Sequence, residues 1–341
     1  MKKKQNVRMK VKTYIGMILL MLTIAQAWGD KTAQKRYVVV SYNCENLFDT
    51  KHDTLKNDSA FLPEGERHWT AGRYWKKLND VGRVILQCGG EKEEWRLPDM
   101  VGLVEVENDS VLTALTRRSM LHNAHYRYVM TSSPDVRGVD VAMLYNPYRL
   151  RLITREEIEI PKKENRRRTR NILYATLLTE TGDSLHVFVV HAPSRGGGVQ
   201  QTEGYRIEVA ERLIMKADSI RNTSATANII VMGDFNDYST DRAIKKIVDA
   251  GLTEVSADVK AKFHPDRIHG TYFFQNEWNS LDHIFATSSL QPIECYIHDA
   301  EWLLEEDKNG IYRPKRTYVW EIYHGGVSDH LPVVFCFRFA E

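Results

Sequence analysis

The chain is poor in cysteine, which limits what can cross-link it. Its 341 residues include only 4 cysteines, Cys44, Cys88, Cys295 and Cys336, and no two of them form a Cys-x-x-Cys pair. Small disulfide scaffolds need far more cysteine, and structural zinc sites need closely spaced thiolates. We therefore expect no zinc site and assign no disulfide pairing. Cys44 and Cys336 lie in apolar runs, which favours buried thiols.

The chain also lacks a strong charge bias, an internal repeat and a low-complexity segment. Lys and Arg number 47 and Asp and Glu 45, so the formal net charge is +2. Apolar residues make up 43%, which excludes a disordered chain. A chain of this length buries a large core without cross-links. No segment of linker composition divides it into two domains.

Residues 1–27 differ from the rest of the sequence. They carry six Lys and Arg and no acid, and an apolar run over residues 14–24 ends in Ala25, Gln26 and Ala27. This is the pattern of a secretory signal peptide, and the run is shorter than the ~20 residues that span a bilayer. An uncleaved anchor is the alternative. We predict an exported protein, periplasmic or secreted, with residues 28–341 as one domain and no membrane span after cleavage.

Removal of this leader changes the charge. A net charge of +2 minus 6 leaves −4 on the mature chain. A mildly acidic domain has no general positive field that attracts nucleic acid.

Short apolar runs rich in β-branched residues recur along the chain and predict core strands. A helical pattern over residues 202–220 places Val209, Leu213 and Ala217 on one face. Strands alternating with helices indicate a layered α/β fold. The predicted strands cover residues 37–42, 100–104, 139–145, 186–190, 229–232, 281–285 and 331–336.

Two segments do not fit this pattern. Residues 51–75 and residues 301–326 mix charged and aromatic side chains and are typical of long loops. Long loops in compact domains often carry function, and surface insertions are equally common, so both interpretations stay open.

Polar and ionisable residues recur where the predicted strands begin or end. One such residue is typically a turn or a helix cap. A whole set at strand ends indicates a site, because α/β proteins build their sites there. The set consists of Asn43, Glu105, His191, Asp234, Asn236, Asp282, Asp329 and His330.

Part of this set offers hard oxygen ligands. The carboxylates of Glu105 and Asp329 and the amide of Asn43 suit Mg²⁺, with Mn²⁺ or Ca²⁺ as alternatives. A cation held by one or two carboxylates keeps positions open for phosphate oxygens.

The other members supply acid–base groups. Asp282 beside His330 would hold the imidazole in one tautomer, and Asp234 would accept a proton from an attacking water. His191 would donate to phosphoryl oxygens or protonate the leaving group. A metal, an oriented water and such donors are the parts of a phosphoester hydrolase.

These residues lie in segments that resemble those of the endonuclease/exonuclease/phosphatase, or DNase I-like, superfamily. Seven segments match, in the order of the family and over residues 37–338. They are residues 41–48 (SYNCENLF), 98–106 (PDMVGLVEV), 138–145 (GVDVAMLY), 190–194 (VHAPS), 233–236 (GDFN), 281–285 (LDHIF) and 328–333 (SDHLPV).

The resemblance implies a four-layer α/β sandwich of two packed, mainly antiparallel sheets flanked by helices. It implies a divalent cation at Glu105 with Asn43 and Asp329 nearby. It further implies that Asp234 and Asn236 align the water and the phosphate.

Two other roles follow from the same resemblance. Asp282 would orient His330 at the scissile phosphate. His191 lies where the DNase I-like and sphingomyelinase-like branch has a catalytic histidine, which favours phosphodiester cleavage.

The sequence departs from the family pattern at two places. Val104 stands where many members have Gln before the metal-binding Glu. No clear counterpart exists for the Tyr or Glu that supports the strand-end His in many members. Asp140 lies in the right region, and satisfaction by local backbone is an equal alternative for it.

Basic residues near these segments are candidates for substrate binding. Arg170 would either clamp a phosphate or serve structure, and residues 166–168 are typical of a solvated loop. Arg195 precedes three glycines and would either contact a phosphate or lie in a plain turn. Arg316 and the aromatic residues of 301–326 would stack on bases or sugars, or pack the loop.

The sequence therefore predicts an exported, Mg²⁺-dependent phosphoesterase. We expect an endonuclease on DNA or RNA, and the alternative is a phosphatase or phosphodiesterase for small or lipid phosphates, such as sphingomyelin or phosphoinositides. A catalytically inactive binding protein on the same scaffold is a third hypothesis, which the full set of site residues argues against. No protein partner can be inferred.

Overall fold

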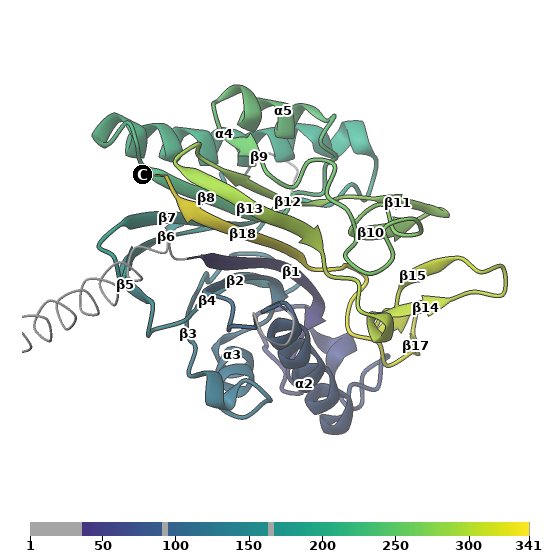
Figure 1. Cartoon of the computed structure of the whole chain (residues 1–341). Helices are drawn as coiled ribbons and strands as arrows, with labels where there is room; N and C mark the ends of the chain where they lie inside the picture. The colour runs from purple at the N-terminus through teal and green to yellow at the C-terminus, as the bar shows by residue number, and fades with distance from the viewer. Residues whose placement is uncertain (1–35, 91–94, 163–166, 341) are drawn as a thin grey trace, which may run out of the picture. The chain divides into compact units, whose positions relative to one another are not determined.

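Two six-stranded β-sheets form the centre of the computed structural model, which describes residues 36–90, 95–162 and 167–340 (Figure 1). The predicted signal peptide lies outside these ranges, so its cleavage and the resulting export stay predictions. From Tyr37 onward the chain forms one compact unit. In spatial order the first sheet contains β13 (Leu290–Ile297), β18 (Val333–Phe339), β1 (Tyr37–Leu47), β2 (Met100–Val106), β4 (Asp140–Tyr145) and β3 (Arg127–Met130).

The second sheet repeats the plan of the first. Neighbouring strands are antiparallel in both sheets except for one parallel pair in each, β1 with β2 and β7 with β8. The prediction of mainly antiparallel sheets is thereby confirmed. The second sheet contains β5 (Leu150–Ile158), β6 (Ile172–Thr179), β7 (Ser184–His191), β8 (Asn228–Asp234), β12 (Asp282–Ala286) and β9 (Thr253–Glu254).

Helices cover the outer face of each sheet and complete four layers (Figure 1). Helices α2 (Ala71–Gln87) and α3 (Asp109–Arg117) lie on the first sheet, and α4 (Val199–Thr223) and α5 (Arg242–Asp249) lie on the second. The predicted four-layer sandwich is therefore correct.

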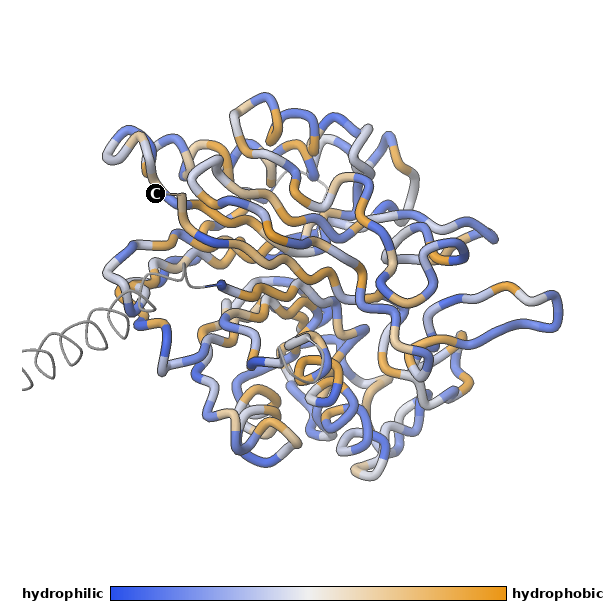
Figure 2. Tube along the Cα trace, in the orientation of Figure 1, coloured by the Kyte–Doolittle hydropathy of each residue, from blue (hydrophilic) through white to orange (hydrophobic). Residues whose placement is uncertain are grey.

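Alternation along the strands explains the layering. In β1, Val38, Val40 and Tyr42 belong to the apolar cluster beneath α2 and α3, while Tyr37 and Val39 belong to the cluster between the sheets. Successive side chains of a strand point to opposite faces, so a continuous apolar run buries both faces. Full burial of one such side chain contributes about 1.5–3 kcal/mol. Figure 2 shows apolar residues recurring along the strands of both sheets.

Helix α4 extends the predicted helix by three residues at each end. Val209, Leu213 and Ala217 are buried against the second sheet, as their spacing predicts, and they form a third apolar cluster with strand residues. This spacing of four residues keeps the three side chains on one helix face.

The two predicted long loops are more ordered than expected. The last residues of 51–75 already belong to α2, and the indole Nε1 of buried Trp69 donates to the Phe48 carbonyl at 3.0 Å. Trp69 thus anchors the segment in the core, which the local sequence does not predict. Residues 301–326 contain a 3₁₀ turn (Glu301–Leu303) and two hairpins, β14–β15 (Leu304–Glu306, Tyr312–Pro314) and β16–β17 (Tyr318–Val319, Ile322–Tyr323).

All four cysteines are free thiols, and Cys44 and Cys336 are buried as expected. None of the helices in the described part of the chain is long and apolar enough to cross a bilayer.

Candidate active site

Strand register in the second sheet aligns three of the predicted residues. His191 at the end of β7 pairs with Asp234 at the end of β8, and Asp234 pairs with Asp282 at the start of β12. Because paired residues lie side by side across a sheet, the three side chains form one row at one edge.

A bulge in the first sheet brings in the next two residues. The pairing of β1 with β2 shifts after Asn43, and Glu45, Asn46 and Glu105 adopt positive φ of 48°, 57° and 64°. Non-glycine residues rarely adopt this conformation, and strained backbone of this kind is found at functional sites as well as in turns. The Asn46 backbone N–H donates to Glu105 Oε2 at 2.9 Å, which fixes the carboxylate at the edge of the sheet.

The two sheets meet around Asp234 and His191. The Nε2 atom of His191 lies 3.8 Å from Asp234 Oδ2 and 3.8 Å from Glu105 Oε1. Asn43 donates from Nδ2 to Asp234 Oδ2 at 3.0 Å. One carboxylate from each sheet therefore faces the same imidazole.

His330 approaches the same carboxylate from the segment before β18. Its Nε2 lies 4.0 Å from Asp234 Oδ2, and its Nδ1 donates to Asp282 Oδ2 at 2.7 Å. The Thr271 hydroxyl donates to that same Asp282 oxygen at 2.6 Å. The predicted pairing of Asp282 with His330 is therefore present in the structure, with Nε2 directed toward Asp234.

The surroundings of the two histidines shift their pKa values in opposite directions. Burial alone lowers the pKa of His330, and the Asp282 carboxylate, with Asp329 and Asp234, outweighs it and raises the pKa well above the ordinary value. Burial and the cations Arg170 and Arg137 lower the pKa of His191 well below the ordinary value. These shifts favour an imidazolium at His330 and a neutral imidazole at His191 near neutral pH.

Asp234 lies between these histidines. Burial, together with the charges of Asp282 and Glu105, raises its carboxyl pKa despite the attraction of His330. Its Oδ1 accepts from the Asn236 backbone N–H at 2.9 Å. A carboxylate with a raised pKa is suited to accept a proton near neutral pH.

The glycine before Asp234 permits this placement. Gly233 has φ of 141°, and a Cβ there would lie 1.9 Å from the Val190 carbonyl oxygen of β7. Only glycine fits so close an approach of two backbones.

Asp329 forms an ion pair with Arg316, and its predicted role as a metal ligand is not tested by this contact. Its Oδ2 accepts from Arg316 Nη2 at 2.6 Å, and Arg316 Nε lies 3.9 Å from Glu45 Oε1. Lys77 is buried beneath these groups and donates to Thr317 Oγ1 at 2.7 Å and to the Glu45 carbonyl. Burial and the Asp329 charge raise the pKa of Glu45 to about 7.

The donor set fits a hard divalent cation with few protein ligands. Glu105, Asp234 and Asp282 concentrate negative charge, which contributes to the raised pKa of Asp234. Within the described residues no three Asp, Glu, His or Cys side chains form a ready-made chelate. Mg²⁺ is commonly held by one or two carboxylates with water and substrate phosphate. Glu105, with the Asn43 amide beside Asp234, meets that requirement, and Asp329 as a ligand stays a prediction.

The arginines predicted to bind substrate are already engaged. Arg170 is 7% exposed and donates from Nη1 to Asp135 Oδ2 at 3.0 Å and from Nη2 to the Ala192 carbonyl at 2.7 Å. Arg195 stacks on Tyr238 at 4.0 Å and lies 3.4 Å from Asp241. Arg170 therefore positions the loop after His191, and the substrate roles of both arginines stay predictions.

Several residues near the centre were not predicted from the sequence. Arg137 donates from Nη2 to Glu105 Oε1 at 3.2 Å, and Lys77, Glu45 and Thr271 support the groups described above. The Asp140 carboxylate accepts hydrogen bonds from nearby groups, Thr131 Oγ1 at 2.6 Å and the Ser133 N–H at 2.8 Å. These contacts agree with the structural one of the two roles considered for Asp140. The only local signal for Glu45 is its position two residues after Asn43.

Comparison with known proteins agrees with this geometry. A family model described as the Endonuclease/Exonuclease/phosphatase family matches residues 38–338. The chain therefore belongs to the endonuclease/exonuclease/phosphatase family. Members of this superfamily are phosphoester hydrolases and are typically dependent on a divalent metal. No curated protein matches the chain.

Solved structures share the fold at low sequence identity. A family protein from Bacteroides thetaiotaomicron is 17% identical, with 90% of this chain and 99% of that chain covered and a TM-score of 0.62. A mannosyl-6-phosphatase from the same organism is 17% identical over 89% of this chain and 100% of its own, with a TM-score of 0.61. TDP2 from D. rerio, complexed with single strand DNA product, is 16% identical over 89% and 99%, with a TM-score of 0.55.

Proposed function

We propose that this protein is an exported, divalent-metal-dependent phosphodiesterase whose substrate is DNA or RNA. The observation that carries the proposal is the convergence of His191, Asp234 and His330 on one point beside Glu105. The Asp234 carboxylate can act as a general base, and it lies between an imidazolium and a neutral imidazole. This arrangement matches the needs of in-line attack by water on phosphorus.

Asp234 would act as the proton acceptor for the attacking water. Asn43 and the Asn236 backbone hold its two oxygens, so the carboxylate is fixed before substrate binds. Its raised pKa gives it the basicity for this step near neutral pH.

The two histidines would act on the phosphate itself. The His330 imidazolium, held by Asp282, would donate to a phosphoryl oxygen and stabilise its developing charge. His191 would donate a hydrogen bond to a second oxygen, and its lowered pKa disfavours the alternative, protonation of the leaving group. Asn236 would help to orient the phosphate.

Glu105, with Asn43 nearby, would hold Mg²⁺, or Mn²⁺ or Ca²⁺ in its place. The bound cation supplies Lewis-acid stabilisation of negative charge on the phosphate. Arg137 would keep the Glu105 carboxylate in place through its hydrogen bond to Oε1.

A second candidate substrate class is a small or lipid phosphate. A pocket of about 420 Å³ beside the centre has the size of a small-molecule site. The structural likeness to a mannosyl-6-phosphatase and the mature charge of −4 add to this alternative.

The test uses the mature protein from Trp28 with Mg²⁺, Mn²⁺ or EDTA. Plasmid DNA, bis-p-nitrophenyl phosphate and p-nitrophenyl phosphate are compared as substrates. His330→Ala removes the imidazolium, and His122→Ala is a matched control at an exposed histidine on another part of the fold.

Plasmid nicking that EDTA and His330→Ala both abolish, with His122→Ala unchanged, is the expected result. Turnover of a small ester with intact plasmid would replace nucleic acid by the second substrate class. Absence of all hydrolysis with either cation would contradict the proposal.

A second measurement is the salt dependence of nucleic acid binding. The logarithm of the binding constant should fall with the logarithm of the salt concentration, with a slope of about −0.9 per contacted duplex phosphate.

A further inference from the structure

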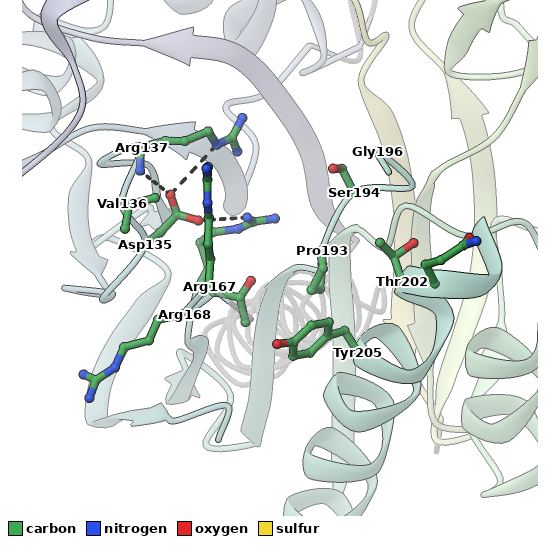
Figure 3. A pocket seen from close by; sticks show the side chains of 13 residues that line it. Asp135, Val136, Arg137, Arg167, Arg168, Pro193, Ser194, Gly196, Thr202 and Tyr205 are labelled. Atoms are coloured by element: carbon green, nitrogen blue, oxygen red, sulfur yellow. Dashed lines mark hydrogen bonds and ion pairs between the residues drawn. The ribbon is translucent and has the colours of Figure 1, made fainter. Parts of the chain in front are cut away.

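A pocket of about 420 Å³ lies next to the proposed catalytic centre. Residues 135–137 and 167–170 line one side, and Pro193, Ser194 and Gly196 with the first turns of α4 line the other. Figure 3 shows Arg137 and Arg167 on one side of it and Ser194, Thr202 and Tyr205 on the other, while the side chain of the lining residue Arg168 extends outward.

The lining of this pocket is strongly basic. Among the described residues it contains the four arginines Arg137, Arg167, Arg168 and Arg170 and one carboxylate, that of Asp135. Asp135 is already bonded to Arg170 at 3.0 Å, so a net positive charge faces the pocket. Burial, and then the like charge of Arg137, lower the pKa of Arg170, which is the effect expected where guanidinium groups crowd.

Two buried polar groups in the lining have no partner among the described residues. They are the Thr169 hydroxyl and the Arg170 Nε, and both residues are 7% exposed. Buried donors are almost always hydrogen-bonded in folded proteins, so an unbonded pair in one pocket indicates a site for an acceptor.

Helix α4 begins at the same pocket. Its N-cap is Gly198 at φ of 115°, no side chain caps it, and its first turn carries no acid. Gln201 and Thr202 of this turn line the pocket. The N-terminus of a 25-residue helix carries partial positive charge and free N–H groups, which favour an anion.

The pocket shares residues with the catalytic centre. Arg137 lines the pocket and also bonds Glu105 at 3.2 Å. Arg170 donates to the Ala192 carbonyl, which also accepts from Asn236 Nδ2 at 3.0 Å. The pocket and the catalytic centre are therefore neighbouring sites, linked through Arg137 and Arg170.

We propose that this pocket is a second anion subsite, which binds another phosphate of the same substrate while one ester is hydrolysed. This inference rests on the proposed function and narrows its substrate class to phosphoesters that carry a second phosphate. The second phosphate comes either from the next nucleotide of a nucleic acid or from a small bisphosphate.

The experiment compares matched pairs of esters with the full mature protein and Mg²⁺. The nucleotide pair is the 5′-p-nitrophenyl phosphate of thymidine with and without a 3′-phosphate. The sugar pair is fructose 6-phosphate against fructose 1,6-bisphosphate. The ratio of kcat/KM within each pair measures the contribution of the second phosphate.

We expect the second phosphate to raise kcat/KM about tenfold in at least one pair, because one added charge-assisted hydrogen bond typically strengthens binding by about this factor. Thr169→Val, which keeps the volume, and Arg168→Gln should each bring that ratio toward one. Arg155→Gln is the matched control, since Arg155 is exposed on β5.

Each outcome distinguishes this inference from the function on which it rests. A rise confined to the nucleotide pair assigns nucleic acid, and a rise confined to the sugar pair assigns a small bisphosphate. Equal kcat/KM within both pairs overturns the subsite and leaves the phosphoesterase standing. A rise that survives both pocket variants overturns it as well, and no hydrolysis of any ester refutes the proposed function instead.

Discussion

Replacement of Asp282 by Asn is the sharpest test of how the His330 imidazolium is held. Asp282 Oδ2 accepts from His330 Nδ1 at 2.7 Å and from Thr271 Oγ1 at 2.6 Å. Asparagine keeps the shape and removes the charge. The variant therefore leaves the buried imidazole without the carboxylate that stabilises its protonated form.

The expected loss follows from the kind of bond that is broken. A hydrogen bond between charged groups is worth roughly 1.5–3 kcal/mol, and about 1.36 kcal/mol corresponds to a tenfold change in rate. Asp282→Asn should therefore lower kcat by about 10- to 150-fold. Thr271→Val removes a second bond to the same carboxylate but leaves the charge pair of Asp282 and His330 in place, so it should lower kcat less than Asp282→Asn does.

The assay is the hydrolysis of bis-p-nitrophenyl phosphate with Mg²⁺, with the melting temperature of each variant measured in parallel. A folded Asp282→Asn protein with kcat within threefold of the wild type would refute the role assigned to this pair. A larger loss for Thr271→Val than for Asp282→Asn would refute it too, because packing rather than charge would then dominate.

Three further predictions concern stability, each measured by urea unfolding. Asp237 is 1% exposed and lies 2.5 Å from Arg206 Nε. Arg206→Met should lower the free energy of unfolding by about 3–5 kcal/mol, because it leaves Asp237 as an unpaired buried charge. A second change, Asp237→Asn, should restore most of that loss. His283 donates to Glu254 at 2.7 Å. Burial lowers the pKa of His283, but the Glu254 carboxylate outweighs burial and raises this pKa above 6.5. Burial raises the pKa of Glu254, but His283 outweighs burial and lowers that pKa below 4.5. The stability difference between the wild type and His283→Gln should therefore be largest between about pH 5 and 6.5, declining at higher pH as His283 deprotonates and at lower pH as Glu254 protonates, and a difference independent of pH would contradict this pairing. Gly233→Ala should destabilise strongly or prevent folding, since its Cβ would lie 1.9 Å from a backbone oxygen, and a variant as stable as the wild type would show that the strands separate easily.

The strand-end residues were predictable because the apolar runs show locally where each strand begins and ends. His191 and Asp234 end two such runs, and Asp282 begins a third, so pairing of the runs places the three side chains in one row. Chemistry at the ends of strands is a general property of such folds.

The surroundings of these residues were not predictable, since they depend on contacts between distant segments. Arg316 reaches Glu45 and Asp329 from the long segment before β18, and Lys77 enters from α2. Lys77 follows another lysine, and two adjacent lysines are typical of the solvated face of a helix. Its spacing from Tyr74 and Val81 is the only signal that it shares their buried side.

Arg170 shows the limit of interpreting a basic run by itself. Its position before a strand was compatible with a phosphate clamp, but Asp135 and the Ala192 carbonyl take both of its terminal nitrogens and leave only Nε for a ligand. The neighbours Arg167 and Arg168 are exposed, as expected of a solvated loop, and they also line the pocket. Which arginine meets a ligand is decided by carboxylates brought from elsewhere in the chain, and the local sequence does not contain that information.

The most direct test of the central claim is the dependence of hydrolysis on Mg²⁺ concentration in the wild type and in Glu105→Gln. The account predicts that bis-p-nitrophenyl phosphate hydrolysis by the wild type rises with Mg²⁺ to saturation, while Glu105→Gln, at unchanged melting temperature, loses about 100-fold or more in rate. An equal rate and an equal Mg²⁺ response in the two proteins would contradict a catalytic centre built on Glu105, Asp234 and His330.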